Sequence, residues 1–212
     1  MINLSEKKLR LTMALRSQAI LSSPILSAIE TIPREKFIAS ALRHHAYENA
    51  SLPIACGQTI SQPYIVAKMT EALDVKSRHI VLEIGTGSGY QASILSLLVR
   101  RVYSIERHRP LFVEARNRLA EMKLTNVTLR LGDGFYGWPE VSPFDRIIIT
   151  CQVESVPFEL IKQLKPDGII IAPLGPPGKE FLTKLTKKGD VIHTEKLISV
   201  RFVPMIPGIA DV

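Results

Sequence analysis

The feature that most constrains this chain is a short apolar segment that runs into a glycine-rich loop, Val81-Leu-Glu-Ile-Gly-Thr-Gly-Ser-Gly-Tyr90. Gly85, Gly87 and Gly89 let the backbone turn tightly and come close to a ligand, because no Cβ atom stands in the way. A helix that begins at the end of this loop would offer unpaired N–H groups to the same ligand. The segment therefore predicts a buried strand, a ligand-binding loop and a helix in succession, as in α/β folds.

The spacing of the glycines narrows the kind of ligand. A dinucleotide fingerprint has glycine at the first, third and sixth places of the loop, and the sixth place here is Tyr90. The pattern acid-x-Gly-x-Gly-x-Gly, led by Glu83, instead resembles that of class I S-adenosylmethionine methyltransferases. This resemblance implies a cofactor site that includes Glu83, Gly85, Thr86, Gly87 and Ser88.

Two further strand ends carry acids in the order that such a site needs. Glu106 lies 17 residues after Gly89, where a carboxylate can accept hydrogen bonds from two ribose hydroxyls. Asp133 and Gly134 follow the next apolar segment and suit an adenine amino group and a close backbone approach. A single acid at a strand end is common in solvated turns, so the prediction depends on both acids occurring in this order. Arg107, the neighbour of Glu106, completes the predicted cofactor site.

From residue 63 onward the chain alternates helix and strand. The expected strands are His79–Ile84, Arg101–Glu106, Val127–Leu131, Phe144–Thr150 and Gly168–Pro173. The expected helices are Pro63–Leu73, Gln91–Val99, Pro110–Met122 and Pro157–Leu164. Because the strands are continuously apolar, we expect a doubly wound, mostly parallel sheet buried on both faces, with ligands at the carboxyl ends of its strands. A turn at Lys188-Gly189-Asp190 between alternating segments predicts a C-terminal β-hairpin.

Length and composition favour one domain. The chain has 212 residues, 46% of them hydrophobic, which is enough to bury a full core. We expect a single domain over 1–212, in which 1–62 form a helical extension with a substrate loop and 63–212 form the cofactor-binding sheet and hairpin. No apolar run approaches a membrane span and no secretory signal is visible. With only two cysteines, Cys56 and Cys151, the sequence predicts a cytoplasmic protein without a metal site.

The chain is basic, with a formal net charge of +7 and a sequence pI of about 9.5. Its basic residues are spread along the chain without a run of five, which is typical of solvated faces. We therefore expect no specific nucleic-acid partner, although a positive field could attract an anionic substrate.

A second informative segment, Leu52–Pro63, precedes the first expected helix of the alternating region. Taken alone, it is an ordinary loop in which Ser61 caps that helix. However, Gly57-Gln-Thr-Ile-Ser-Gln-Pro63 resembles a motif of the protein-L-isoaspartate O-methyltransferases, and the resemblance extends roughly from Ile32 to Pro204. It implies that Ser61 is the catalytic residue beside the methyl acceptor. It also implies a substrate site that includes Thr59, Ile60, Val200, Arg201, Phe202 and Val203.

The same resemblance implies a Rossmann-like fold and a protein-repair activity. The methyl donor would be S-adenosyl-L-methionine, its product S-adenosyl-L-homocysteine, and the acceptors isoaspartyl-containing proteins and peptides. We also expect the protein to act as a monomer. Three positions depart from the family pattern and affect the expected lid: Ala55-Cys56, Thr150-Cys151-Gln152 and Ile206.

The residues available fit transfer of a methyl group to a carboxylate. A carboxyl group with a reference pKa of about 4 is already ionised near neutrality, so no strong base is needed. Ser61 would orient the acceptor carboxylate and Glu106 would hold the ribose. Two other functions remain open: a methyltransferase of the same fold that acts on RNA or a small molecule, supported by the basic pI alone, and a noncatalytic binding module.

Overall fold

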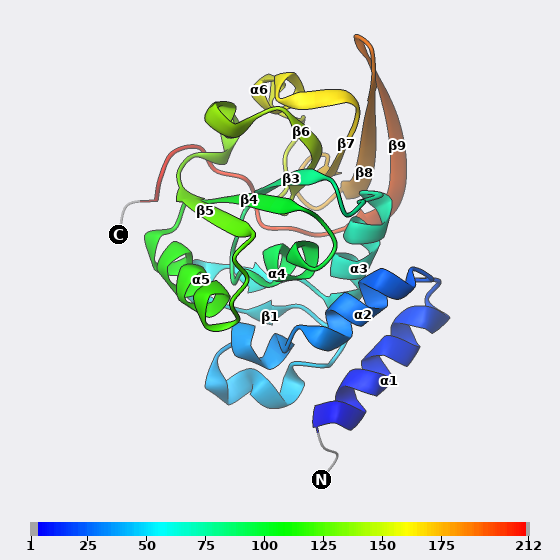
Figure 1. Ribbon diagram of the computed structural model, residues 1–212, viewed down its shortest axis with the longest axis vertical. Helices are drawn as coiled ribbons and strands as arrows, with labels where there is room; N and C mark the ends of the chain where they lie inside the picture. The colour runs from blue at the N-terminus through cyan, green and yellow to red at the C-terminus, as the bar shows by residue number, and fades with distance from the viewer. Residues whose placement is uncertain (1–3, 211–212) are drawn as a thin grey trace.

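A seven-stranded sheet forms the centre of the computed structural model, which describes residues 4–210 (Figure 1). In spatial order its strands are β5 (Val127–Leu131), β4 (Arg101–Glu106), β3 (Ile80–Ile84), β6 (Phe144–Ile149), β7 (Leu164–Leu174), β8 (Glu180–Lys188) and β9 (Val191–Val200). The pairs from β5 to β7 are parallel, whereas β8 and β9 pair antiparallel as a hairpin. The predicted fold, a doubly wound sheet with a C-terminal hairpin, is confirmed.

Helices surround this sheet, and two of them form the N-terminal extension. These are α1 (Leu4–Ser17) and α2 (Ser23–Thr31), which lie together at one end of the molecule in Figure 1. The others are α3 (Pro63–Ala72), α4 (Tyr90–Ser96), α5 (Arg109–Glu121) and α6 (Phe158–Lys162). The described residues also form five short 3-10 helices: η1 (Arg34–Phe37), η2 (Ser40–His45), η3 (Ala55–Gly57), η4 (Gly134–Tyr136) and η5 (Pro139–Val141). None of the helices described between residues 4 and 210 is long and apolar enough to cross a membrane.

Both faces of the sheet are buried, which explains why its strands are continuously apolar. Successive side chains of a strand point to opposite faces. Val81 and Ile148 pack with α3 and α4, whereas their neighbours Leu82 and Ile147 pack on the other face, against Leu160 of α6. Each of these side chains is fully buried. Truncating one to alanine in such a core typically costs about 2–5 kcal/mol of unfolding free energy, so this layered core holds the strand ends in place.

The structure corrects the prediction between residues 157 and 173. We expected a helix to Leu164 and a strand from Gly168, but α6 ends at Lys162 and β7 begins at Leu164. Leu164 pairs with Phe144 of β6, and the register then shifts before Ile169 pairs with Arg146. The turn residues Pro166 to Gly168 lie in the irregularity between these two pairings, and Asp167 keeps a positive φ of 60° there. They form a bulge within the strand because the residues on both sides pair with β6.

Candidate active site

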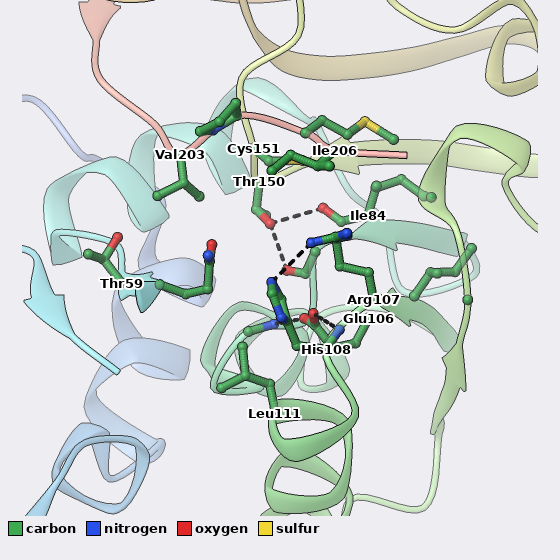
Figure 2. Close-up of a pocket in the computed structure, with 18 residues that line it drawn as sticks. Thr59, Ile84, Glu106, Arg107, His108, Leu111, Thr150, Cys151, Val203 and Ile206 are labelled. Atoms are coloured by element: carbon green, nitrogen blue, oxygen red, sulfur yellow. Dashed lines mark hydrogen bonds between the residues drawn. The ribbon is translucent and has the colours of Figure 1, made fainter. Parts of the chain in front are cut away.

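The glycine loop follows β3 at the point where the strand order reverses. Gly85, Gly87 and Gly89 all have positive φ, at 95°, 54° and 89°. The Thr150 hydroxyl at the end of β6 lies 2.9 Å from the carbonyl oxygen of Ile84 and 2.7 Å from that of Gly85 (Figure 2). A Cβ atom on Gly85 would lie 2.5 Å from this hydroxyl oxygen. The loop thus needs glycine at residue 85 for its φ and for its contact with β6.

Glu83 lies behind the loop rather than in a cavity. Its carboxylate is fully buried and accepts a 2.5 Å hydrogen bond from the Ser104 hydroxyl. The hydroxyls of Ser104 and Thr86 are 2.6 Å apart, so Thr86 continues this chain of hydrogen bonds into the loop. Burial raises the pKa of Glu83 to about 8, although the hydrogen bond from Ser104 acts in the opposite direction. Glu83 is therefore neutral below about pH 8, and it supports the glycine loop through Ser104 and Thr86.

Glu106, at the end of β4, joins the glycine loop to the start of α5. Its Oε2 accepts a 2.7 Å hydrogen bond from the Gly87 N–H, and its Oε1 accepts one of 2.9 Å from the His108 N–H. The carboxylate is 4% exposed and keeps further lone pairs, because each oxygen can accept more than one hydrogen bond. Figure 2 shows it beside Arg107 and His108.

The third strand end, after β5, holds the C-terminal segment against the site. Asp133 accepts hydrogen bonds from the Phe135 N–H at 2.8 Å and the Gly208 N–H at 2.7 Å. Arg107 donates to the Gly208 carbonyl at 3.1 Å. A Cβ atom on Gly134 would lie 2.4 Å from Cγ2 of Ile84, so glycine is required for the close approach of this turn to β3.

These strand ends enclose a cavity, called here the strand-end cavity. Of the predicted residues, it is lined by Thr59, Gly85, Gly87, Glu106, Arg107, Gly134 and Val203. The sequence did not predict the other lining residues as cofactor or substrate contacts, although it named Thr150, Cys151 and Ile206 among the positions that affect the lid. These other residues are Gln58, Ile84, Ile105, His108, Leu111, Gly132, Thr150, Cys151, Pro204, Met205 and Ile206. Glu83 and Asp133 do not line it. Position at a strand end could have suggested Thr150 and Cys151, whereas no local signal marks Leu111 or Met205.

The substrate loop, Leu52–Pro63, is held in shape by a short antiparallel pair of strands. In this pair, β1 (Leu52–Pro53) matches β2 (Thr59–Ile60), with Leu52 opposite Ile60. Ser61 follows directly and lines two further spaces. The serine cavity also contains Ile60, Thr86, Ser88, Tyr90, Gln91 and Thr150 among its walls. The outer groove, of about 540 Å³, is lined by Ser51, Thr59, Ser61, Gln62, Ile65, Gly178, Ser199, Val200, Arg201 and Phe202. Ser61 therefore lies between the glycine loop and the C-terminal end of β9.

Gln152 holds the segment that closes this site, a role that the sequence did not predict although it placed Gln152 among the positions that affect the lid. Its N–H donates to the Val203 carbonyl at 2.8 Å, and its carbonyl accepts from the Met205 N–H at 2.8 Å. Its buried side chain donates to the Gly175 carbonyl at 2.7 Å. Residues 203–206, called here the lid, line the strand-end cavity and are thus anchored to the segment that follows β6. Within residues 4–210, no group of three or more His, Cys, Asp or Glu side chains could hold a metal ion.

The family model described as Protein-L-isoaspartate(D-aspartate) O-methyltransferase matches residues 6–209. The chain belongs to this family. The family and the enzyme class predicted from the motifs are thereby confirmed. Methylation of isoaspartyl residues in protein repair, with S-adenosylmethionine as the methyl donor, is the activity of protein-L-isoaspartate O-methyltransferases.

Individual relatives cover nearly the whole chain. A protein-L-isoaspartate O-methyltransferase of Parvibaculum lavamentivorans is 52% identical over 208 residues, which are 97% of this chain and 94% of the relative. One from Paramagnetospirillum magneticum is 49% identical over 205 residues, 96% of each chain. A solved protein-L-isoaspartate O-methyltransferase superposes with a TM-score of 0.87 at 29% identity, covering 95% of this chain and 67% of its own. A Plasmodium falciparum structure solved with S-adenosyl-L-homocysteine has a TM-score of 0.79 at 20% identity, with 93% and 97% coverage, and supports the fold.

The buried Glu83 leads to a prediction about pH. The unfolded chain releases the Glu83 proton near pH 4.5, whereas the folded chain holds it until about pH 8. Between these values the folded state binds more protons, so the contribution of Glu83 to stability falls as the pH rises. We expect Glu83→Gln, which keeps an acceptor for Ser104, to remove this decline. Urea unfolding at several pH values measures it, and equal slopes for the two proteins would show that Glu83 ionises normally.

Proposed function

We propose that the donor S-adenosylmethionine occupies the strand-end and serine cavities, and that an isoaspartyl carboxylate reaches it through the outer groove. One observation carries this proposal: Ser61 lines both the serine cavity, beside the glycine loop, and the outer groove. A group placed at Ser61 is therefore in contact with a space for the donor and a space for a peptide.

The residues around the strand-end cavity fit a nucleoside with an amino-acid tail. We assign the ribose to the remaining lone pairs of Glu106, and the close backbone approach to Gly85, Gly87 and Gly134. Thr86 and Ser88 would contact the donor in the serine cavity, whose walls include both residues. Glu83 and Asp133 would act indirectly. The first supports Thr86 through Ser104, and the second holds Gly208, while Arg107 closes the same side.

The chemistry that remains for the protein is alignment. Attack of a carboxylate oxygen on the donor methyl forms the C–O bond of the ester and breaks the C–S bond, whose electron pair leaves with sulfur as S-adenosylhomocysteine. Within residues 4–210 the Ser61 hydroxyl has no hydrogen-bond partner of its own, so it is free to donate to that carboxylate. Holding the reacting atoms in line lowers the barrier by several kcal/mol without a general base.

The outer groove supplies the contacts for the peptide. Thr59, Val200, Arg201 and Phe202 line it, whereas Ile60 lies in the serine cavity and Val203 in the strand-end cavity. Arg201 is exposed and is the charged residue of the groove, where it would attract the acceptor carboxylate. In this arrangement, residues 1–62 bring the substrate loop and residues 63–212 bring the cofactor site, together forming one functional domain.

We further propose that the protein works as a monomer in the cytoplasm. Both of its cysteines are free thiols, which suits a reducing compartment. Light scattering should then give a mass near 23.6 kDa in dilute solution. A mass of twice that value would show a dimer, and cell fractionation that recovers the protein with extracellular material would contradict the location.

The activity is tested with two peptides that differ only in carrying L-isoaspartate or L-aspartate at one position. We expect label from radioactive S-adenosylmethionine to appear in the isoaspartyl peptide alone and to be released by base, as a methyl ester is. Label on both peptides would contradict the proposed selectivity. Label on neither, with donor binding confirmed by calorimetry, would direct the search to RNA or small-molecule acceptors.

Ser61→Ala tests the proposed role of the hydroxyl. A hydrogen bond to a charged group contributes about 1.5–3 kcal/mol, so turnover should fall by roughly tenfold to a hundredfold. Binding of S-adenosylhomocysteine, measured by calorimetry, should change little. Ser17→Ala is a control, because its exposed hydroxyl bonds to Ala14 within α1, far along the chain from the site. Normal turnover in Ser61→Ala would remove Ser61 from the mechanism.

A further inference from the structure

Ser61 sits in a turn whose two ends are held by different contacts. Before it, the β1–β2 pair places Thr59 opposite Pro53 and Ile60 opposite Leu52. After it, α3 begins at Pro63, and the N-cap residue is Gln62 rather than Ser61. The Gln62 side chain makes no capping hydrogen bond to the helix. Pro63 has no N–H group, so the first free N–H of α3 is that of Tyr64. It needs an acceptor from outside the helix.

That acceptor is Asn49, which lies before the substrate loop. Its Oδ1 accepts a 2.9 Å hydrogen bond from the Tyr64 N–H, the second residue of α3. Its own carbonyl accepts a 2.8 Å hydrogen bond from the Gln62 side chain. Its Nδ2 donates to Gln18, at the end of α1, at 3.2 Å. One half-buried residue thus contacts the chain on both sides of Pro63, immediately after Ser61.

The Asn49 contacts explain why Ser61 does not cap α3, the role that its position in the sequence favours. A serine beside a helix start ordinarily caps the helix, because its side-chain oxygen accepts a hydrogen bond from a free backbone N–H. Here Asn49 satisfies the Tyr64 N–H from 15 residues away, so the serine oxygen is not needed there. Ser61 instead lines the serine cavity and the outer groove.

We infer that Asn49 is a positioning residue for methyl transfer: it caps α3 in place of Ser61 and so keeps the Ser61 hydroxyl free for the acceptor carboxylate. This inference rests on the proposed role of Ser61. Loss of the Asn49 oxygen leaves the Tyr64 N–H without its acceptor. Ser61, three residues earlier in the chain, carries a hydroxyl of the kind that caps a helix start and would be drawn into that role. A small displacement of an aligned group is enough to slow a transfer reaction severely.

The test compares Asn49→Ala with Asn49→Asp in the full chain. The aspartate keeps an acceptor oxygen for the Tyr64 N–H, whereas the alanine does not. We expect turnover of the isoaspartyl peptide to fall by about tenfold in Asn49→Ala and to recover to within about threefold of wild type in Asn49→Asp. In the Ser61→Ala background, where no serine hydroxyl can take over the cap, amide hydrogen exchange at Tyr64 by NMR should be faster with Asn49→Ala and unchanged with Asn49→Asp. Binding of S-adenosylhomocysteine should stay within about twofold of wild type in both variants.

A double-mutant cycle with Ser61→Ala separates positioning from general damage. If Asn49 acts through Ser61, adding Asn49→Ala to Ser61→Ala should lower turnover by less than about twofold. Asn126→Ala is the matched control, because this half-buried asparagine also makes two side-chain hydrogen bonds, here to the carbonyls of Ser96 and Val99, which do not line the groove. Its turnover should remain at the wild-type level.

Each contrary result has a distinct meaning. Unchanged exchange at Tyr64 when Asn49→Ala is added to Ser61→Ala would overturn the capping role. A full tenfold loss in the Ser61→Ala background would show that Asn49 acts on the fold and would overturn the positioning role. If Ser61→Ala itself has normal turnover, the proposed function of Ser61 fails, while the exchange measurement still decides whether Asn49 caps α3.

Discussion

The contact between the ends of β3 and β6 is the constraint on which the site depends. The strand order reverses here, and the Thr150 hydroxyl bridges to the carbonyls of Ile84 and Gly85. A side chain on Gly85 would collide with that hydroxyl. These bonds hold the ends of β3 and β6 together. The chain leaves β3 toward β4 and leaves β6 toward β7, so the segments after the two strands diverge and leave space for the strand-end cavity. The lid, anchored through Gln152 on the same extension of β6, is positioned by the same contact.

Two carboxylates near the loop have different tasks because their surroundings differ. Glu83 is sealed beneath the loop, where burial raises its pKa and a single hydroxyl donates to it. Glu106 lies at the cavity wall and accepts hydrogen bonds from two backbone N–H groups, those of Gly87 and His108. The first acid supports the loop, and the second is left with the lone pairs that a ribose requires. A shared motif position therefore does not imply direct contact with a ligand.

The catalytic proposal depends on bringing together three segments that are distant in sequence. The substrate loop contributes Ser61, β3 contributes the glycine loop, and the end of β9 contributes Arg201 and its neighbours. A carboxylate acceptor needs no base, so precision of placement becomes the main requirement. The β1–β2 pair and Asn49 meet that requirement by holding the turn on both sides of Ser61.

Sequence alone determined most of the strands, the glycine loop, the edge hairpin and the family, because these depend on local properties: continuous apolarity, freedom of φ at glycine, and a motif of contiguous residues. Positions at strand ends also identified Glu106 and Gly134 as residues of the cavity wall. Only the tertiary structure showed that Asp133 bonds to Gly208, that β7 begins at Leu164, and that Asn49 caps α3. Each of these depends on a partner many residues away. A donor or acceptor forms its hydrogen bond with a partner that the folded chain brings within reach, and a local sequence pattern does not identify a partner that is distant in the sequence.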